Sequence, residues 1–195
     1  SSYSPEDSRC LPVLQEIPQG YDACVTMRLD CDEDISSSAP LFDLYQSEKI
    51  PFSLALHTSV IAEAGHQLYL EAVIASGGCL LSHSVTHPVN WGGSYEEASH
   101  QAIRSRKDIQ EALPGVRLDY AVSPFHQNPP YALQALADAS YQGFVGGIIC
   151  NDPEYLMARG GVVPHVSGNF IGHSQQCMLH GESLLNSDDS LANFK

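Results

Sequence analysis

The stretch GCLLSHSVTH, residues 78–87, joins a short apolar strand to two histidines that lie four residues apart. Histidines at this spacing can approach one another on a helical turn, close enough to share one metal ion. The spacing occurs in many mononuclear zinc sites. A structural pair is the alternative, but the position of His83 and His87 directly after a strand favours a metal site.

Short apolar segments alternate with longer helical ones on both sides of this stretch. The expected strands cover residues 24–29, 51–57, 78–82, 116–122, 143–150, 162–166 and 176–179. The expected helices cover residues 39–47, 59–75, 95–113, 130–140 and 153–159. This order predicts a single α/β domain over 1–195, with a core of about 22–185. Its parallel sheet is either open or closed into a barrel, with helices outside.

Two carboxylates follow the first expected strand, in RLDCDED, residues 28–34. Residues two apart share a face of an extended chain, so Asp30 and Asp32 can point into one pocket. Carboxylates so close favour a bound cation, with one serving as ligand and the other staying free as a base. An acidic turn is the alternative. Two histidines and one carboxylate would leave metal positions open for water and substrate.

A further candidate comes late in the chain, where the apolar segment CMLHG, residues 177–181, delivers His180 before a glycine. A lone histidine in such a place is most often a hydrogen-bonded core residue, so the pattern alone leaves its role open. The remaining histidines lack a comparable context and are expected to be structural or surface residues, although the first of them also ends a strand: His57, His66, His100, His126, His165 and His173.

Taken together, these motifs resemble the NodB-homology domain of polysaccharide deacetylases, the fourth family of carbohydrate esterases. Asp30 and Asp32 resemble its first motif, Asp-x-Asp. The segment from His83 to His87 matches its second, His-Ser/Thr-x-x-His, and His180 resembles the end of its last, Leu-x-His. The motifs stand in family order, over roughly four fifths of the chain.

The resemblance implies a distorted (β/α) barrel with about seven parallel strands. It implies a metal-dependent hydrolase that removes N-acetyl or O-acetyl groups from a carbohydrate polymer or oligosaccharide. Asp32, His83 and His87 would bind one divalent metal ion, expected to be zinc. Asp30 would be the general base, and His180 the acid that protonates the leaving amine. A non-catalytic sugar-binding module and a small-amide or cyclic-amide hydrolase on the same scaffold remain as alternatives. Substrate-binding residues are not identified.

The chain departs from the family pattern in two places. The third motif normally carries an arginine that steadies the catalytic carboxylate, but the matching residues 121–126 read AVSPFH. Arg28, two residues before Asp30 on the same strand face, could supply that charge. The fourth motif is unclear, with Asp152 as a substitute. Trp91, the sole tryptophan, could be a sugar platform or a loop anchor.

Composition narrows the choice of partners. A formal charge of −14, from 23 acidic and 9 basic residues, would repel nucleic-acid phosphates and anionic membranes. It would tolerate neutral or cationic sugars. No apolar run approaches the ~20 residues of a membrane span, and no signal-peptide pattern opens the chain. The six cysteines form no CxxC pair, so reduced thiols are expected, although disulfides remain open. Nothing here predicts an oligomeric state.

Overall fold

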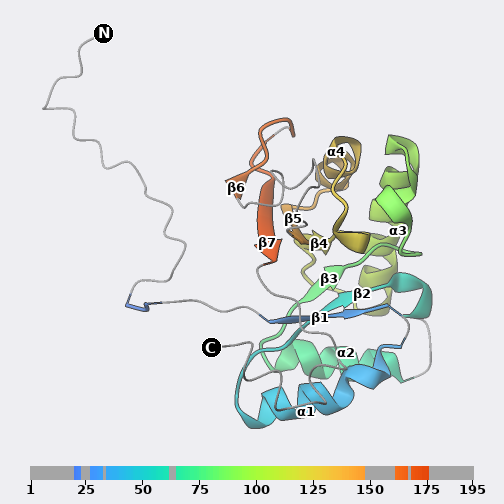
Figure 1. The fold of residues 1–195 in the computed structure, drawn as a ribbon. Coiled ribbons are helices and arrows are strands. Elements are labelled where there is room, and N and C mark those ends of the chain that lie inside the picture. Colours follow the sequence, from blue (N-terminus) through green and yellow to red (C-terminus); the bar gives the residue numbers. More distant parts are fainter. Residues whose placement is uncertain are drawn as a thin grey trace, which may run out of the picture.

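The computed structural model describes residues 20–22, 27–32, 34–61, 65–147, 161–166 and 168–175. Within these ranges, seven strands form one sheet in the order β1-β2-β3-β4-β5-β7-β6. Their bounds are β1 (Arg28–Cys31), β2 (Ser53–Leu56), β3 (Leu80–Ser82), β4 (Tyr120–Val122), β5 (Gly143–Gly147), β6 (Gly161–Val162) and β7 (Ile171–Gln175). All neighbours are parallel except the β6–β7 pair, which is antiparallel. The sheet turns strongly from β1 to β7 (Figure 1), and within the described residues it stays open. The expected α/β fold with a mostly parallel, distorted sheet is therefore confirmed.

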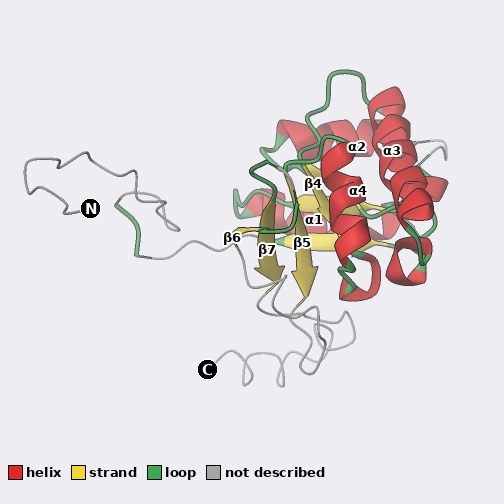
Figure 2. Cartoon of the chain, turned by 90° about the horizontal axis from the view of Figure 1, so that it is seen from above, coloured by secondary structure: helices red, strands yellow, loops and turns green. Residues whose placement is uncertain are grey.

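The four α-helices of the described ranges lie along one face of this sheet (Figures 1 and 2). They are α1 (Ala39–Ser47), α2 (His66–Ala75), α3 (Tyr95–Ala112) and α4 (Pro130–Asp138). Short 3₁₀ turns connect them to the strands: η1 (Ser36–Ser38), η2 (Thr58–Val60), η3 (Val89–Gly92) and η4 (Pro124–His126). No helix in the described part of the chain is long and apolar enough to cross a membrane.

The two faces of the sheet bury different amounts of apolar surface. On the helix side, Leu54, Leu56 and Phe144 are fully buried in the main core cluster. On the opposite, inner face, Ala55 belongs to a much smaller cluster. Because Asp30 pairs in register with Ala55, and side chains alternate along a strand, Asp30 faces the inner side.

Helix α3 is the longest of the described helices and packs against β3, the strand that precedes His83. Its N-terminus is capped by Ser94, whose side chain accepts a hydrogen bond from the Glu97 backbone N–H at 3.2 Å. Its buried stripe includes Gln101, Ser105 and Ile109. Ser105 Oγ lies 2.6 Å from Ser82 Oγ on β3, which ties the helix to the end of that strand.

Several expected boundaries shift. Strand β1 runs to Cys31, whereas the sequence predicts an end at residue 29; residues 24–26 of the expected strand lie outside the described part. The helix expected over 59–75 is wrong at its start, because η2 occupies its first residues and α2 begins only at His66. The strand expected over 162–166 is confined to Gly161–Val162.

Strand β7 was not predicted at all. Its sequence, IGHSQ, lacks the apolar run by which the other strands are identified, and it forms by pairing with β5 over five residues. The expected helix 153–159 and strand 176–179 lie outside the described residues.

Two of the six cysteines lie in the described residues, and both carry free thiols: Cys31 is buried and Cys79 exposed. Burial raises the pKa of the Cys31 thiol to about 12, so this side chain behaves as a small core residue.

Candidate metal centre

Polar side chains follow the carboxyl ends of four adjacent parallel strands. Asp32 comes after β1, His57 after β2, His83 after β3, and His126 ends the turn after β4. Since β1, β2, β3 and β4 are neighbours in the sheet, their ends meet at one edge. This is where parallel α/β folds carry their functional groups.

Three of the predicted residues converge there. Nε2 of His83 lies 3.3 Å from Oδ1 of Asp32 and 3.0 Å from Nε2 of His87. Nε2 of His87 lies 3.8 Å from the same carboxylate oxygen. Donor atoms held about 2.0–2.2 Å from one zinc ion in a tetrahedral arrangement lie about 3.3–3.6 Å from each other. The three residues therefore fit a single divalent ion, and they are the group of potential ligands that stands out among the described residues.

The ring of His83 is oriented by the sheet itself. It is buried, and its Nδ1–H donates to the Val122 carbonyl on β4 at 2.9 Å. This bond fixes the tautomer, so Nε2 presents a lone pair toward Asp32 and His87. A second hydrogen bond of this kind is typical of metal-binding histidines.

His87 reaches the same point through a loop rather than a helix. The spacing predicted a helical turn, but Ser84 and His87 both have left-handed backbone conformations, with φ of 69° and 50°. The chain therefore folds back over β3. The His87 ring lies 4.6 Å from the His83 ring and 4.5 Å from the Phe125 ring, measured between centroids.

Asp30 forms an ion pair with an arginine of its own strand. Nε of Arg28 donates to Oδ1 of Asp30 at 2.6 Å, and Nη2 donates to Oδ2 at 3.0 Å. The contact expected between these side chains is therefore present, in the two-bond form that arginine makes best with a carboxylate. The Asp30 side chain remains 27% exposed, so a molecule bound at the strand ends can reach it.

Burial acts on these groups in opposite directions. It would raise the pKa of Asp30, but the hydrogen bond from Arg28 and the neighbouring positive charges bring that pKa below its ordinary value. The pKa of Asp32 is lowered chiefly by its contact with His83. Burial and His83 lower the pKa of His87, which favours the neutral imidazole that binds metals.

Two histidines regarded as structural lie beside this centre. Nδ1–H of His57 donates to the Asp32 carbonyl at 2.7 Å, and its ring lies 6.3 Å from the His87 ring. His126 is close enough to Asp30 for the carboxylate to influence its pKa, which burial lowers overall. The sequence signal for His57 was its position at a strand end; His126 gave no comparable signal.

Three further residues singled out in the sequence are not placed at this centre. Trp91 is fully buried, so the sugar-platform interpretation is wrong and the loop-anchor interpretation holds. His180 and Asp152 lie outside the described residues.

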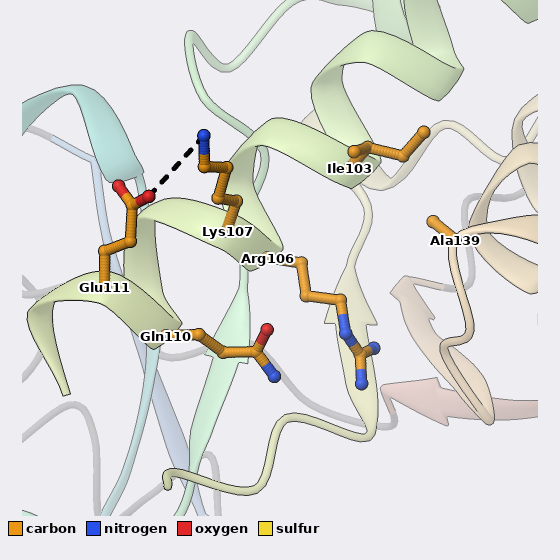
Figure 3. A pocket seen from close by; sticks show the side chains of 6 residues that line it. All are labelled: Ile103, Arg106, Lys107, Gln110, Glu111 and Ala139. Atoms are coloured by element: carbon orange, nitrogen blue, oxygen red, sulfur yellow. Dashed lines mark ion pairs between the residues drawn. The ribbon is translucent and has the colours of Figure 1, made fainter. Parts of the chain in front are cut away.

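Two hollows lined by described residues lie away from the three donors. One of about 370 Å³ lies against the outer side of α3 (Figure 3), where Lys107 and Glu111 form an ion pair of 3.5 Å. A second, of about 750 Å³, lies between η2 and α3 and includes Thr58 and Val85 in its wall. The chemistry of the donor groups, rather than the size of a hollow, locates the site.

No protein-family model matches the sequence, and no curated protein matches it either. Solved structures do match the fold. A family 4 carbohydrate esterase from Streptomyces lividans, in complex with acetate, is similar with a TM-score of 0.56 and 16% identity. The match covers 64% of this chain and 62% of that enzyme, so the chain spans less than two thirds of its length.

Two further structures match over more of their length. The Xyl-CE4 domain of a multidomain xylanase, from the hindgut metagenome of Trinervitermes trinervoides, has a TM-score of 0.56 and 16% identity, with 86% of this chain and 82% of that one covered. A family 4 acetyl xylan esterase from Clostridium thermocellum, in complex with a cobalt ion, has a TM-score of 0.56, 15% identity and the same coverage. The chain therefore has the fold of polysaccharide deacetylases, which confirms the resemblance that its motifs predicted.

Proposed function

We propose that this protein is a metal-dependent hydrolase that removes acetyl groups from a carbohydrate, with N-acetyl groups as its first target. The observation that carries the proposal is the pairing of two arrangements at one sheet edge. Donor atoms of Asp32, His83 and His87 converge at 3.0–3.8 Å, and beside them an arginine-bound carboxylate, Asp30, remains accessible. The fold likeness to carbohydrate esterases supports the substrate class.

Asp32, His83 and His87 would hold the divalent ion. Such an ion acts as a Lewis acid toward an acyl oxygen and makes a nearby water more acidic. Zinc suits a set of two imidazoles and one carboxylate, and one of the similar structures holds cobalt, which accepts the same ligands.

Asp30 would act as the general base. Its lowered pKa keeps it ionised at neutral pH, and Arg28 fixes the direction of its oxygens. It would take a proton from the attacking water while the water oxygen bonds to the acyl carbon. The nitrogen then leaves as the carbon–nitrogen bond breaks, and it requires a proton because an amide anion is a very poor leaving group. His180 is proposed as the donor of that proton. Acetate and a free amine are the products.

Acetate release tests the proposal directly. The protein would be incubated with an N-acetylated glucosamine oligomer and, separately, with O-acetylated xylan, each with and without a chelator. Release that stops with chelator and returns on addition of zinc supports the proposal. A protein that binds zinc but releases no acetate from either substrate would instead be a binding module.

A further inference from the structure

We propose that Gln101, on helix α3, is a positioning residue for the metal centre, because it holds the loop that delivers His87. This inference rests on the proposed metal site. It concerns a residue that lies outside every motif of the sequence, and its side chain forms hydrogen bonds to Val85, Thr86 and Glu97 rather than to the three ligands.

The loop between His83 and His87 has a backbone conformation that these residues do not favour without contacts from other segments. Ser84 and His87 both have positive φ, a conformation that is sterically unfavourable for residues with a side chain. Such residues persist only where the surrounding structure determines their conformation. The contacts around this loop therefore decide where the His87 imidazole lies.

Two carbonyl groups of the loop accept hydrogen bonds from η2. The backbone N–H of Thr58 donates to the Ser84 carbonyl at 3.1 Å, and that of Ser59 donates to the Val85 carbonyl at 3.2 Å. Within the loop, the His87 N–H donates to Ser84 Oγ at 2.9 Å. Two consecutive N–H groups then remain, those of Val85 and Thr86.

Both of these groups donate to one atom, Oε1 of Gln101. The distances are 2.9 Å from the Val85 nitrogen and 3.2 Å from the Thr86 nitrogen. Gln101 is only 4% exposed, so water is a poor substitute for this acceptor. One side chain on α3 thus accepts the hydrogen bonds of both backbone N–H groups in the middle of the loop.

The amide end of Gln101 is fixed as well. Nε2 donates to Oγ1 of Thr86 at 3.1 Å and to Oε1 of Glu97 at 3.3 Å. A reversed amide would point its own hydrogens at two N–H donors, so the observed orientation is the one that the surroundings allow. Glu97 lies one helical turn before Gln101, which couples the loop to the capped start of α3.

Gln101→Leu tests the inference, because leucine fills a similar volume but accepts no hydrogen bond. We expect zinc affinity, measured by competition with a chromophoric chelator, to fall by roughly 10–100-fold, the usual cost of losing an outer contact of a metal site. Gln101→Glu keeps the acceptor but sets a second carboxylate beside that of Glu97, so it should lose less affinity than Gln101→Leu without matching the parent protein. Gln101→Asn, which withdraws the acceptor but stays polar, serves if the leucine variant does not fold, and the same loss is expected.

Ile109→Ala provides a matched control on the same helix. It removes buried apolar contacts far from the loop, so it should lower the melting temperature of the metal-free protein while zinc affinity stays unchanged. Parent-like affinity in folded Gln101→Leu or Gln101→Asn would overturn the inference, as would an equal loss in Ile109→Ala. If the parent protein itself binds no zinc, that result refutes the proposed metal site, and with it the role of Gln101.

Discussion

The ends of β1 and β3 build the candidate centre in different ways. At β1 the chain stays extended, and simple alternation places Arg28 and Asp30 on one face, where they pair within a single strand. At β3 the chain turns sharply, and His87 returns toward His83 only because groups from η2 and α3 hold the loop. One strand end is organised locally, whereas the other depends on the rest of the fold.

This difference predicts that substitutions at the two strand ends have different effects. Substitutions at β1 should alter the chemistry of one carboxylate while the other still binds metal. Substitutions at β3 should act on metal binding as a whole. The predictions that follow test this division, beginning with the largest expected effect.

His87→Ala should abolish metal binding and, with it, acetate release. The parent protein is expected to carry one ion per chain, measured by elemental analysis after dialysis against trace zinc. His100→Ala is the control, because that histidine lies on the outside of α3 and is 65% exposed. Full metal occupancy in His87→Ala would refute the ligand assignment.

Asp30→Asn should separate base from ligand at β1. We expect kcat/KM to fall by roughly 10²–10⁴-fold, because a general base is lost, while zinc content stays at one ion per chain. Asp32→Asn should instead lower the zinc affinity. The reverse result, with metal lost in the first variant and kept in the second, would mean that base and ligand have been exchanged.

His180→Ala extends the comparison to a histidine that follows the strand expected over 176–179, outside the described residues. If His180 protonates the leaving amine, amide cleavage should slow by roughly 10²–10⁴-fold. An activated acetyl ester, whose leaving group needs little protonation, should be hydrolysed nearly as fast as by the parent. Equal losses on both substrates would assign His180 a packing role.

Arg28→Met should move the pH dependence rather than abolish activity. Burial raises the pKa of Asp30, and the contact with Arg28 lowers it, so removing Arg28 leaves the raising effect. The acid limb of the kcat/KM profile should therefore shift to higher pH, and Arg28→Lys should restore part of the shift. An unchanged acid limb would show that Asp30 is not the titrating base.

The same pair predicts a stability effect with a defined sign. Because the folded pKa of Asp30 lies below its ordinary value of 3.8, the ionised carboxylate stabilises the folded state above that pH. This contribution disappears as the pH falls through the folded pKa. Arg28→Met should therefore lower the melting temperature at neutral pH and have less effect in strong acid.

The sequence by itself determined the α/β class, because apolar strands and helical segments alternate clearly from residue 28 to residue 147. It also determined the types of group at the ends of β1 and β3. The pairing of Arg28 with Asp30 was predictable, since residues two apart on a strand must share a face. Strand β7 was missed because its residues lack an apolar pattern, and only its pairing with β5 and β6 makes it a strand.

Tertiary structure alone decided how the imidazole of His87 is placed next to that of His83. A spacing of four suggests a helical turn, yet the chain uses left-handed residues that are stable only with partners far away in sequence. Gln101 lies 15 residues beyond Thr86 and 16 beyond Val85, and no local pattern distinguishes it from the other polar residues of its helix. Likewise His57 lies 25 residues from Asp32, so their contact arises only when β1 and β2 pair. Residue types and strand ends are properties of the local sequence, whereas the contacts that fix a ligand's position come from segments that meet only in the folded chain.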